Sequence, residues 1–310
     1  MGAFRFGVLA ETAGSVEEVA ATARRAEELG YDTVLLRDHF VPEPFGDQVA
    51  PLIGLAAAAA ATSRLRVGTL VLDNDYRHPV MLAKEAATLQ QLSGGRFELG
   101  LGAGWLRVEY EAAGMAFDRA GVRVGRLEES VRLVKELFAG KEVRFEGEHY
   151  RIDGVTNYPA VDLAPAVLIG AGSPRMLRLA GREADTVGIL AKTLPGGTIS
   201  DAMEERLSSA FATKADLVRA EGRNVEISSV VSVDLADDPR AAAERYAVER
   251  GWGAGAADLV EDMPAKFLGP LDHIVELAHR RRECLGLSYL VVSDRELEAA
   301  APLVRALSGR

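Results

Sequence analysis

The chain has 310 residues, with 46 acidic and 36 basic side chains and a formal net charge of −10. Its 48% hydrophobic content excludes a mainly disordered chain, and its single cysteine, Cys284, excludes an internal disulfide. The acidic balance argues against a nucleic-acid partner, because neutralising phosphates requires clustered Lys and Arg.

Short β-branched runs that predict strands recur along the whole chain. They are Arg5–Leu9, Thr33–Leu36, Arg66–Leu72, Phe97–Gly102, Val167–Gly170, Thr186–Leu190, Glu226–Val233 and Ser288–Val292. Helical spacing predicts helices between and after them, at Ser15–Leu29, Pro51–Thr62, Pro79–Leu92, Val122–Phe138, Pro174–Arg182, Asp201–Ala220, Pro239–Arg250 and Leu271–Leu285.

Eight alternating strand–helix units favour a closed α/β (β/α)8 TIM barrel over an open doubly wound sheet. A Gly-x-Gly-x-x-Gly run does not follow the first strand, which argues further against a dinucleotide-binding sheet. We expect one domain over residues 1–310, with insertion segments near 141–165 and 192–200. The first alternates in strand fashion around Gly147 and predicts a hairpin, and the second predicts a mobile loop over the barrel mouth.

Nothing in the sequence predicts a membrane segment. The longest apolar stretch, Val49 to Ala61, is interrupted by Pro51 and is shorter than the roughly 18 residues of a membrane span. The first residues show no basic region before a long apolar core, so no signal peptide is expected. We therefore expect a cytoplasmic protein with no membrane partner.

In a (β/α)8 barrel the active site lies at the carboxyl ends of the strands, where this chain places Asp38 and His39. Histidine changes its charge near neutral pH and is suited to moving a proton during reduction or oxidation of a substrate. The alternative is a histidine packed at the barrel rim. The histidines and carboxylates show no metal-ligand spacing, so no metal is expected.

Two glycine-containing strand ends predict a ligand-binding surface. The run Gly100-Leu-Gly-Ala-Gly104 leaves room for a flat ligand, and Trp105 follows directly. In Gly170-Ala-Gly-Ser-Pro-Arg175, Ser173 is the expected N-cap of a helix whose amides, with Arg175, suit a phosphate. Close helix–strand packing and a merely well-capped helix are the respective alternatives. Positive charge for an anion is expected from Arg37, Arg77, Arg107, Arg175 and Lys192.

The runs Gly68–Pro79 and Ser93–Trp105, with Arg37-Asp38-His39 and Ala26–Tyr31, resemble the bacterial-luciferase-like superfamily, in particular its coenzyme F420-dependent oxidoreductases. The resemblance spans essentially the whole chain and is densest from Phe4 to Gly125. It implies a barrel that binds a deazaflavin, or in other branches FMN, at its carboxyl-end face.

Site residues also follow from the resemblance. His39 would lie near the reacting face of the ring, and Asp38 would face the ring or orient His39. A bulge with a non-prolyl cis peptide at Leu70–Val71 would back the ring, and Asp73 ends the same strand among the expected cofactor-binding residues. Gly102, Ala103 and Gly104 would line the cofactor, and Trp105, also among the expected cofactor-binding residues, would either stack on a planar ring or plug the barrel mouth. Gly170, Ala171, Gly172 and Ser173, with Arg175, would meet its ribityl-phosphate region.

Trp105 is a departure from the family pattern. The sugar-phosphate dehydrogenases that the chain resembles carry a glutamate, proposed as a catalytic acid, after the glycines of the fourth strand. Trp105 occupies that position here, which argues against sugar-phosphate activity and against a mechanism that needs this carboxylate. Glu109 or Tyr110, about one helical turn later, would serve a different substrate.

Three functions follow from these observations. The first is an F420-dependent oxidoreductase that transfers a hydride between the deazaflavin and a small organic substrate, with His39 managing the proton. The second is an FMN-dependent monooxygenase, and the third is a barrel that binds cofactor without catalysis. We expect a homodimer, because the helix Pro51–Thr62 offers a flat, alanine-rich face and because members of the family commonly form dimers through barrel helices.

Overall fold

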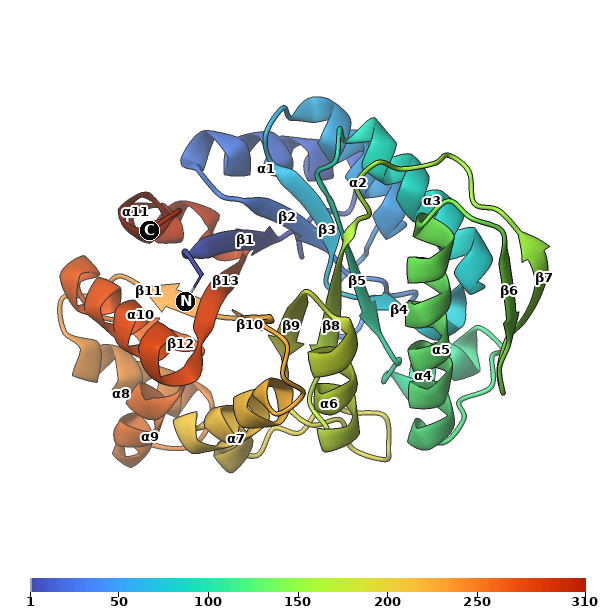
Figure 1. Cartoon of the computed structure of the whole chain (residues 1–310). Coiled ribbons are helices and arrows are strands. Elements are labelled where there is room, and N and C mark those ends of the chain that lie inside the picture. Colours follow the sequence, from blue (N-terminus) through green and yellow to red (C-terminus); the bar gives the residue numbers. More distant parts are fainter. Residues whose placement is uncertain (1) are drawn as a thin grey trace.

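The computed structural model describes residues 2–310 and contains a closed barrel of parallel strands (Figure 1). Strand β5 pairs with β3 as well as with β8, and this pairing closes the ring. Its eight strand positions are β1 Arg5–Leu9, β2 Thr33–Leu36, β3 Arg66–Thr69 continued by β4 Leu72–Asp73, β5 Phe97–Gly102, β8 Ala166–Ala171, β9 Thr186–Ile189, β10 Glu226–Val230 and β13 Leu287–Ser293. The predicted (β/α)8 barrel is confirmed.

Two expected strands are each divided in the structure. The stretch Arg66–Leu72 breaks into β3 and β4 at a cis peptide bond between Leu70 and Val71, where the resemblance placed it. The stretch Glu226–Val233 breaks into β10 and β11 Ser232–Asp234, and β11 leaves the barrel to pair with β12 Lys266–Leu268. In both cases strand-forming residues continue across the change of direction, so the sequence pattern does not show it.

Helices surround the barrel on the outside (Figure 1). They are α1 Val16–Leu29, α2 Pro51–Ala61, α3 Pro79–Leu92, α5 Ala120–Phe138, α6 Pro174–Glu183, α7 Ser208–Arg219, α8 Pro239–Glu249, α10 Leu271–Leu285 and α11 Leu297–Leu307, with short α4 Arg107–Ala112 and α9 Ala257–Asp262. Single 3-10 turns are η1 Asn74–Tyr76, η2 Met203–Arg206, η3 Ala254–Ala256 and η4 Asp294–Glu296. None of α4, α9 and α11 is among the expected helices, and α11 contains Pro302.

Local sequence explains how the first unit is bounded. Ser15 and Glu18 form the expected capping box at the start of α1, and Gly30 ends the helix with φ of 88°. Apolar side chains between strands and helices form the main core, while alternate strand residues such as Leu9, Leu35 and Tyr289 form a second cluster with Leu70. The inner cluster fills the barrel below the cis bond.

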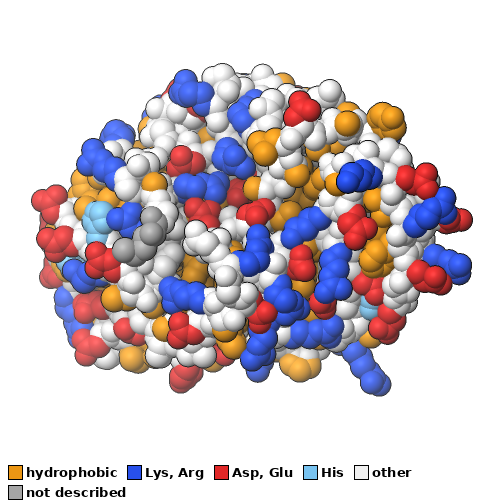
Figure 2. All heavy atoms as spheres, in the orientation of Figure 1, with side chains coloured by type: hydrophobic (Ala, Val, Ile, Leu, Met, Phe, Trp, Pro, Cys, Tyr) orange, Lys and Arg blue, Asp and Glu red, His pale blue; other side chains and the backbone are white. Residues whose placement is uncertain are grey.

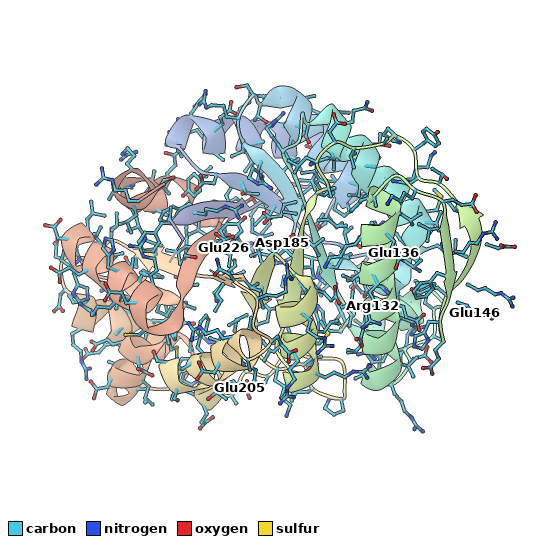
Figure 3. All side chains as sticks on the ribbon, in the orientation of Figure 1. Arg132, Glu136, Glu146, Asp185, Glu205 and Glu226 are labelled. Atoms are coloured by element: carbon cyan, nitrogen blue, oxygen red, sulfur yellow. The ribbon has the colours of Figure 1, made fainter. Side chains whose placement is uncertain are left out.

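Outside the barrel, the segment after α5 forms an antiparallel hairpin of β6 Val143–Glu146 and β7 Arg151–Val155. Figure 3 shows Glu146 on the far side of α5 from the barrel, whereas Arg132 and Glu136 lie on α5 itself. The carboxylate of Glu129 on α5 accepts hydrogen bonds from the backbone N–H groups of residues 148 to 150 and so attaches the hairpin.

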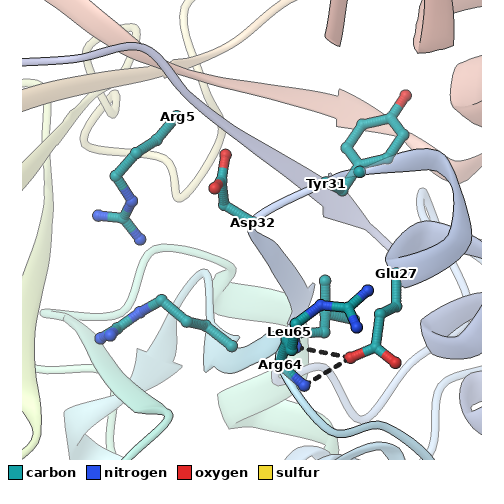
Figure 4. A pocket seen from close by; sticks show the side chains of 8 residues that line it. Arg5, Glu27, Tyr31, Asp32, Arg64 and Leu65 are labelled. Carbon is teal, nitrogen blue, oxygen red and sulfur yellow. Dashed lines mark hydrogen bonds between the residues drawn. The ribbon is translucent and has the colours of Figure 1, made fainter. Parts of the chain in front are cut away.

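The amino ends of the strands carry charged groups that stabilise the barrel. Arg5 pairs with Glu98 at 3.3 Å and with Glu226 at 2.7 Å, and Figure 3 shows Glu226 near Asp185 within the ring of strands. A shallow cleft of about 370 Å³ opens at this end (Figure 4). There Glu27 accepts the backbone N–H groups of residues 63 to 65, which fixes the entry to β3.

Across residues 2–310, no helix combines the length and the apolar character needed to cross a membrane.

Candidate active site

A cavity of about 910 Å³ opens at the carboxyl ends of the barrel strands. The loops after β2, β5, β8 and β9 contribute to its lining, including the expected insertion at residues 192–200, and so does the segment Leu70–Asp73. That insertion is a small hairpin in which Thr193 and Ile199 form a β-bridge, and its Gly197 lies against the backbone of Arg107. The insertion therefore forms one wall of the cavity mouth.

His39 lines the cavity and is held by a buried carboxylate. Its Nδ1 lies 2.9 Å from Oε2 of Glu109, which Tyr76 also contacts through its hydroxyl at 3.1 Å. A hydrogen bond from Nδ1–H to Glu109 leaves Nε2 as the nitrogen that can accept or donate a proton. Glu109 therefore supplies the orienting contact that was one of the two roles expected of Asp38.

Glu109 is a carboxylate despite its burial. Burial opposes its ionisation, but hydrogen bonds from His39 and from the backbone N–H groups of Phe40 and Val41 outweigh burial and lower the pKa of Glu109. Sequence reasoning named Glu109 only as one option because helix α4, which carries it, is not among the expected helices. Thus Trp105 replaces one glutamate, and a carboxylate enters the site one turn later.

Aromatic side chains enclose His39. Phe45 stacks on its imidazole with ring centroids 4.7 Å apart, and Trp105 meets it edge-on at 6.0 Å. Arg37 lies 4.1 Å above the Phe45 ring and pairs with Glu11 at 2.5 Å. These contacts exclude water from the imidazole and so strengthen its hydrogen bond with Glu109.

Asp38 is buried beside Arg77, and the two side chains form a paired hydrogen-bonded contact. Its Oδ2 also accepts the backbone N–H of Asp73 at 3.2 Å. Asp38 lines the cavity, but its charge is directed to Arg77. The geometry thus gives Asp38 the role of tying the strand end of β2 to that of β4.

Asp73 ends β4 and lines the same cavity. The hydroxyl of Tyr110 lies 2.9 and 2.8 Å from its two carboxyl oxygens, and Oδ1 accepts the N–H of Asp75. Burial raises the pKa of Asp73 to about 7 from 3.8, since these hydrogen bonds offset only part of the cost of burying a charge. The proximity of Asp75 and Asp38 adds to this rise.

The glycines after β5 are required by packing within the site. A Cβ on Gly104 would lie 1.9 Å from the Tyr110 hydroxyl oxygen and 2.5 Å from Asp73 Oδ2, and Gly104 has φ of +72°. A Cβ on Gly102 would lie 2.7 Å from Val71 Cγ2. Both glycines line the cavity, as does Ala103 between them, but the crowding that requires glycine comes from the protein itself.

Gly104→Ala is expected to destabilise the protein by more than Gly114→Ala does. Gly114 has a similar φ of +69° but has no atom within 4 Å of a built Cβ. The control measures backbone strain of about 1 kcal/mol or more, and the difference measures the clash with Tyr110 and Asp73. Urea unfolding of both variants gives the comparison, and equal losses would contradict a packing role for Gly104.

The segment after β8 places only part of the expected phosphate site at the cavity. Gly170, Gly172 and Ser173 line it, and Ser173 is the N-cap of α6 without a capping hydrogen bond from its side chain. Ala171 faces the main core instead. Arg175 donates to the carbonyl of Gly121 at 2.9 Å, which directs it toward α5.

Cations of the cavity wall are mostly engaged by the protein. Arg123 donates to the carbonyl of Ala103, and the Phe117 ring lies between the guanidinium groups of Arg107 and Arg123. Lys192 lies at the mouth. Elsewhere, Figure 2 shows basic and acidic side chains interspersed over the face in view, which does not form a continuous basic surface.

The cavity fits a tricyclic ring with a phosphorylated side chain. Its volume suits a cofactor-sized ligand, and Leu70, Val71, Gly102 and Gly170 provide a largely apolar floor. The uncapped start of α6 offers backbone N–H donors for a phosphate. Within residues 2–310, no group of three or more His, Cys, Asp or Glu side chains is placed to hold a metal ion.

Comparison with protein families identifies the chain. The family model described as luciferase-like monooxygenase matches residues 3–298. The protein therefore belongs to the luciferase-like monooxygenase family, and the resemblance drawn from its motifs is confirmed.

Curated relatives carry names of F420-dependent dehydrogenases. An F420-dependent glucose-6-phosphate dehydrogenase of Kineococcus radiotolerans is 35% identical over 235 residues, 73% of this chain and 66% of that protein. One of Nakamurella multipartita is 42% identical over 54% of this chain and 50% of that protein. The chain thus spans between half and about two thirds of these dehydrogenases. An F420-dependent hydroxymycolic acid dehydrogenase of Mycobacterium tuberculosis is 31% identical over 86% of this chain and 73% of that protein.

Solved structures share the fold over nearly the whole chain. An F420-dependent secondary alcohol dehydrogenase in complex with an F420–acetone adduct matches with a TM-score of 0.75 and 18% identity, covering 98% of this chain and 99% of that one. The monooxygenase RslO1 from Streptomyces bottropensis matches with a TM-score of 0.73 and 25% identity, covering 97% and 96%.

Proposed function

We propose that the protein is a coenzyme F420-dependent oxidoreductase that transfers a hydride between the deazaflavin and a small organic substrate. The observation that carries the proposal is the buried His39–Glu109 pair on the wall of a cofactor-sized cavity. The F420-dependent names of relatives that align over most of this chain support the cofactor.

Residues of the first half of the barrel would do the chemistry. Bound deazaflavin supplies a ring carbon that gives or takes a hydride. His39 Nε2 takes the proton of an alcohol as it is oxidised, or returns it to a carbonyl, while Glu109 stabilises the imidazolium. Trp105 and Phe45 exclude water from the imidazole, and Ser173 with the first amides of α6 holds the phosphate.

These observations support a class of substrate, an alcohol and the corresponding carbonyl compound. The relatives are named as dehydrogenases of glucose 6-phosphate and of hydroxymycolic acid, and both of these compounds carry hydroxyl groups. An imidazole that takes a hydroxyl proton suits an alcohol–carbonyl pair. The aromatic surroundings of His39 favour an apolar substrate carbon over a polyhydroxylated one.

Fluorescence titration of the purified protein with F420 and with FMN tests the cofactor. Micromolar or tighter binding of F420, with far weaker binding of FMN, is the expected result. Preference for FMN would overturn the proposal and favour the second candidate, an FMN-dependent monooxygenase, which the family model and the likeness to RslO1 support. In either case, His39→Ala should abolish turnover and keep cofactor affinity, whereas a non-catalytic barrel has no turnover to lose.

Three expectations stay predictions: the homodimer, the lack of nucleic-acid and membrane partners, and the cytoplasmic location.

A further inference from the structure

Four carboxyl groups lie at the floor of the cavity or just behind it, and three of them face a cation or an imidazole. The pairs are Asp38 with Arg77, Glu109 with His39, and Asp75 with Arg126 at 3.1 Å. Asp73 is the fourth. Its hydrogen bonds come from two neutral donors, the Tyr110 hydroxyl and the backbone N–H of Asp75.

Hydrogen-bond counting around Tyr110 favours an additional proton. The Tyr110 oxygen lies 2.9 and 2.8 Å from the two oxygens of Asp73 and 3.2 Å from Oδ2 of Asp75. A tyrosine hydroxyl donates one hydrogen bond, so it can satisfy one of these three carboxyl oxygens. With both aspartates ionised, the remaining oxygens would repel each other in a buried environment, which a shared proton prevents.

The surroundings decide which aspartate holds that proton. Asp75 lies beside the Arg126 guanidinium, which stabilises its negative charge. Asp73 is 8% exposed and has Asp75 and Asp38 as neighbours, which disfavours a second negative charge there. Two arrangements are consistent with these distances. In one, the Asp73 O–H donates to Tyr110 and the Tyr110 O–H donates to Asp75. In the other, the Asp73 O–H points toward the cavity and Tyr110 donates to Asp73.

On the basis of the proposed function, we propose that Asp73 holds the one proton that Asp73 and Asp75 have between them. Without cofactor, the Asp73 O–H donates to Tyr110 and the Tyr110 hydroxyl donates to Asp75; when cofactor binds, the Asp73 O–H turns toward the cavity and donates to the cofactor. Asp73 is then a neutral hydrogen-bond donor, whereas Glu109 is ionised and accepts hydrogen bonds. Tyr110 is the positioning residue, and Gly104 provides the space in which its hydroxyl meets Asp73. A hydride brings negative charge to its acceptor, and a neutral buried acid stabilises that charge better than a carboxylate does.

The shared proton can be tested on the protein without cofactor. Infrared difference spectra of wild type against Asp73→Asn are expected to show the band of a protonated carboxyl group at pH 6. Tyr110→Phe should shift the frequency of that band, while Tyr31→Phe should not. Tyr31 is a matched control because its buried hydroxyl donates to the carbonyl of Leu297, away from the cavity. A wild-type spectrum without the band would overturn the shared proton.

The contact with cofactor is tested by measuring the Kd for F420 across pH 6 to 9. Wild-type affinity is expected to fall by about tenfold per pH unit once Asp73 ionises. Asp73→Asn keeps a neutral donor and should remove this component, and Asp73→Ala should bind more weakly throughout. Tyr110→Phe should move the fall to higher pH, because Asp73 then loses a donor to its anion, and Tyr31→Phe should leave it in place.

The two proposals fail in different ways. If F420 binds but wild type and Asp73→Asn share one pH profile, the contact between Asp73 and cofactor is overturned while the F420-dependent function stands. If F420 does not bind at any pH, the proposed function is overturned, and with it the contact to cofactor. The infrared band then still decides whether Asp73 and Asp75 share a proton.

Discussion

Replacing Glu109 by glutamine is expected to slow hydride transfer by about 100- to 1,000-fold and to change cofactor affinity by less than about fivefold. The carboxylate fixes the His39 tautomer through Nδ1 and stabilises the imidazolium that forms when Nε2 takes a proton. Glutamine preserves the size of the side chain and removes the charge. Single-turnover absorbance changes of F420 give the rate, and fluorescence titration gives the affinity.

Glu111→Gln is the matched control, since Glu111 is on the same helix, exposed, and 3.9 Å from Arg107. It is expected to behave as wild type in both measurements. A Glu109→Gln enzyme as fast as wild type would show that His39 needs no charged partner. A loss of affinity equal to the loss of rate would instead assign Glu109 to ligand binding.

Asp73→Asn is expected to remove a decline in stability with rising pH. Asp73 has a pKa of about 7 in the folded protein, raised from 3.8 by burial. Between these values the folded protein keeps a proton that the unfolded chain has lost, so this contribution to stability is complete below about pH 4 and disappears as pH rises through 7. One pKa unit corresponds to about 1.4 kcal/mol, so wild type should lose about 2 to 3 kcal/mol more than Asp73→Asn between pH 5 and pH 8.

Urea unfolding of both proteins at each pH gives the two curves. Other charged and titratable groups face Asp73 from helices α4 and α5, from η1 and from the loops after β2 and η1. They are Tyr110, Asp75, Tyr76, Asp38, Arg77, Arg123 and Arg126. Because their own contributions remain in the variant, the difference between curves isolates Asp73. Asp216→Asn, on exposed α7, should give a curve parallel to wild type, and parallel curves for Asp73→Asn would contradict the prediction.

Strand positions could be predicted because parallel barrel strands are buried on both sides and therefore read as continuous apolar runs. The bounds of β1, β2 and β5 agree residue for residue with the expected ones. That pattern does not show where a strand changes direction, so the breaks after Thr69 and Val230 were not predicted from it. Resemblance to a family, rather than periodicity, placed the cis bond at Leu70–Val71.

Within the site, the sequence located the strand-end residues but not their partners. Asp38 was expected to face the ring or to orient His39, and the structure pairs His39 with Glu109 and Asp38 with Arg77. Both true partners lie on segments that follow other strands, so sequence distance gives no sign of them. A signal was available for Glu109: it lies between the apolar Val108 and Tyr110, just after a predicted strand end.

The barrel divides its tasks between two halves of the chain. His39, Asp73 and Glu109 come from the loops of β2, β4 and β5, whereas the facing wall with Ser173 and the 192–200 hairpin comes from β8 and β9. The two halves meet along the β5–β8 and β1–β13 pairings, which consist of regular parallel registers. Exchanging the second half for that of a relative would therefore transplant a different binding wall onto an unchanged set of proton-handling groups, so substrate range and chemistry can evolve separately in this protein.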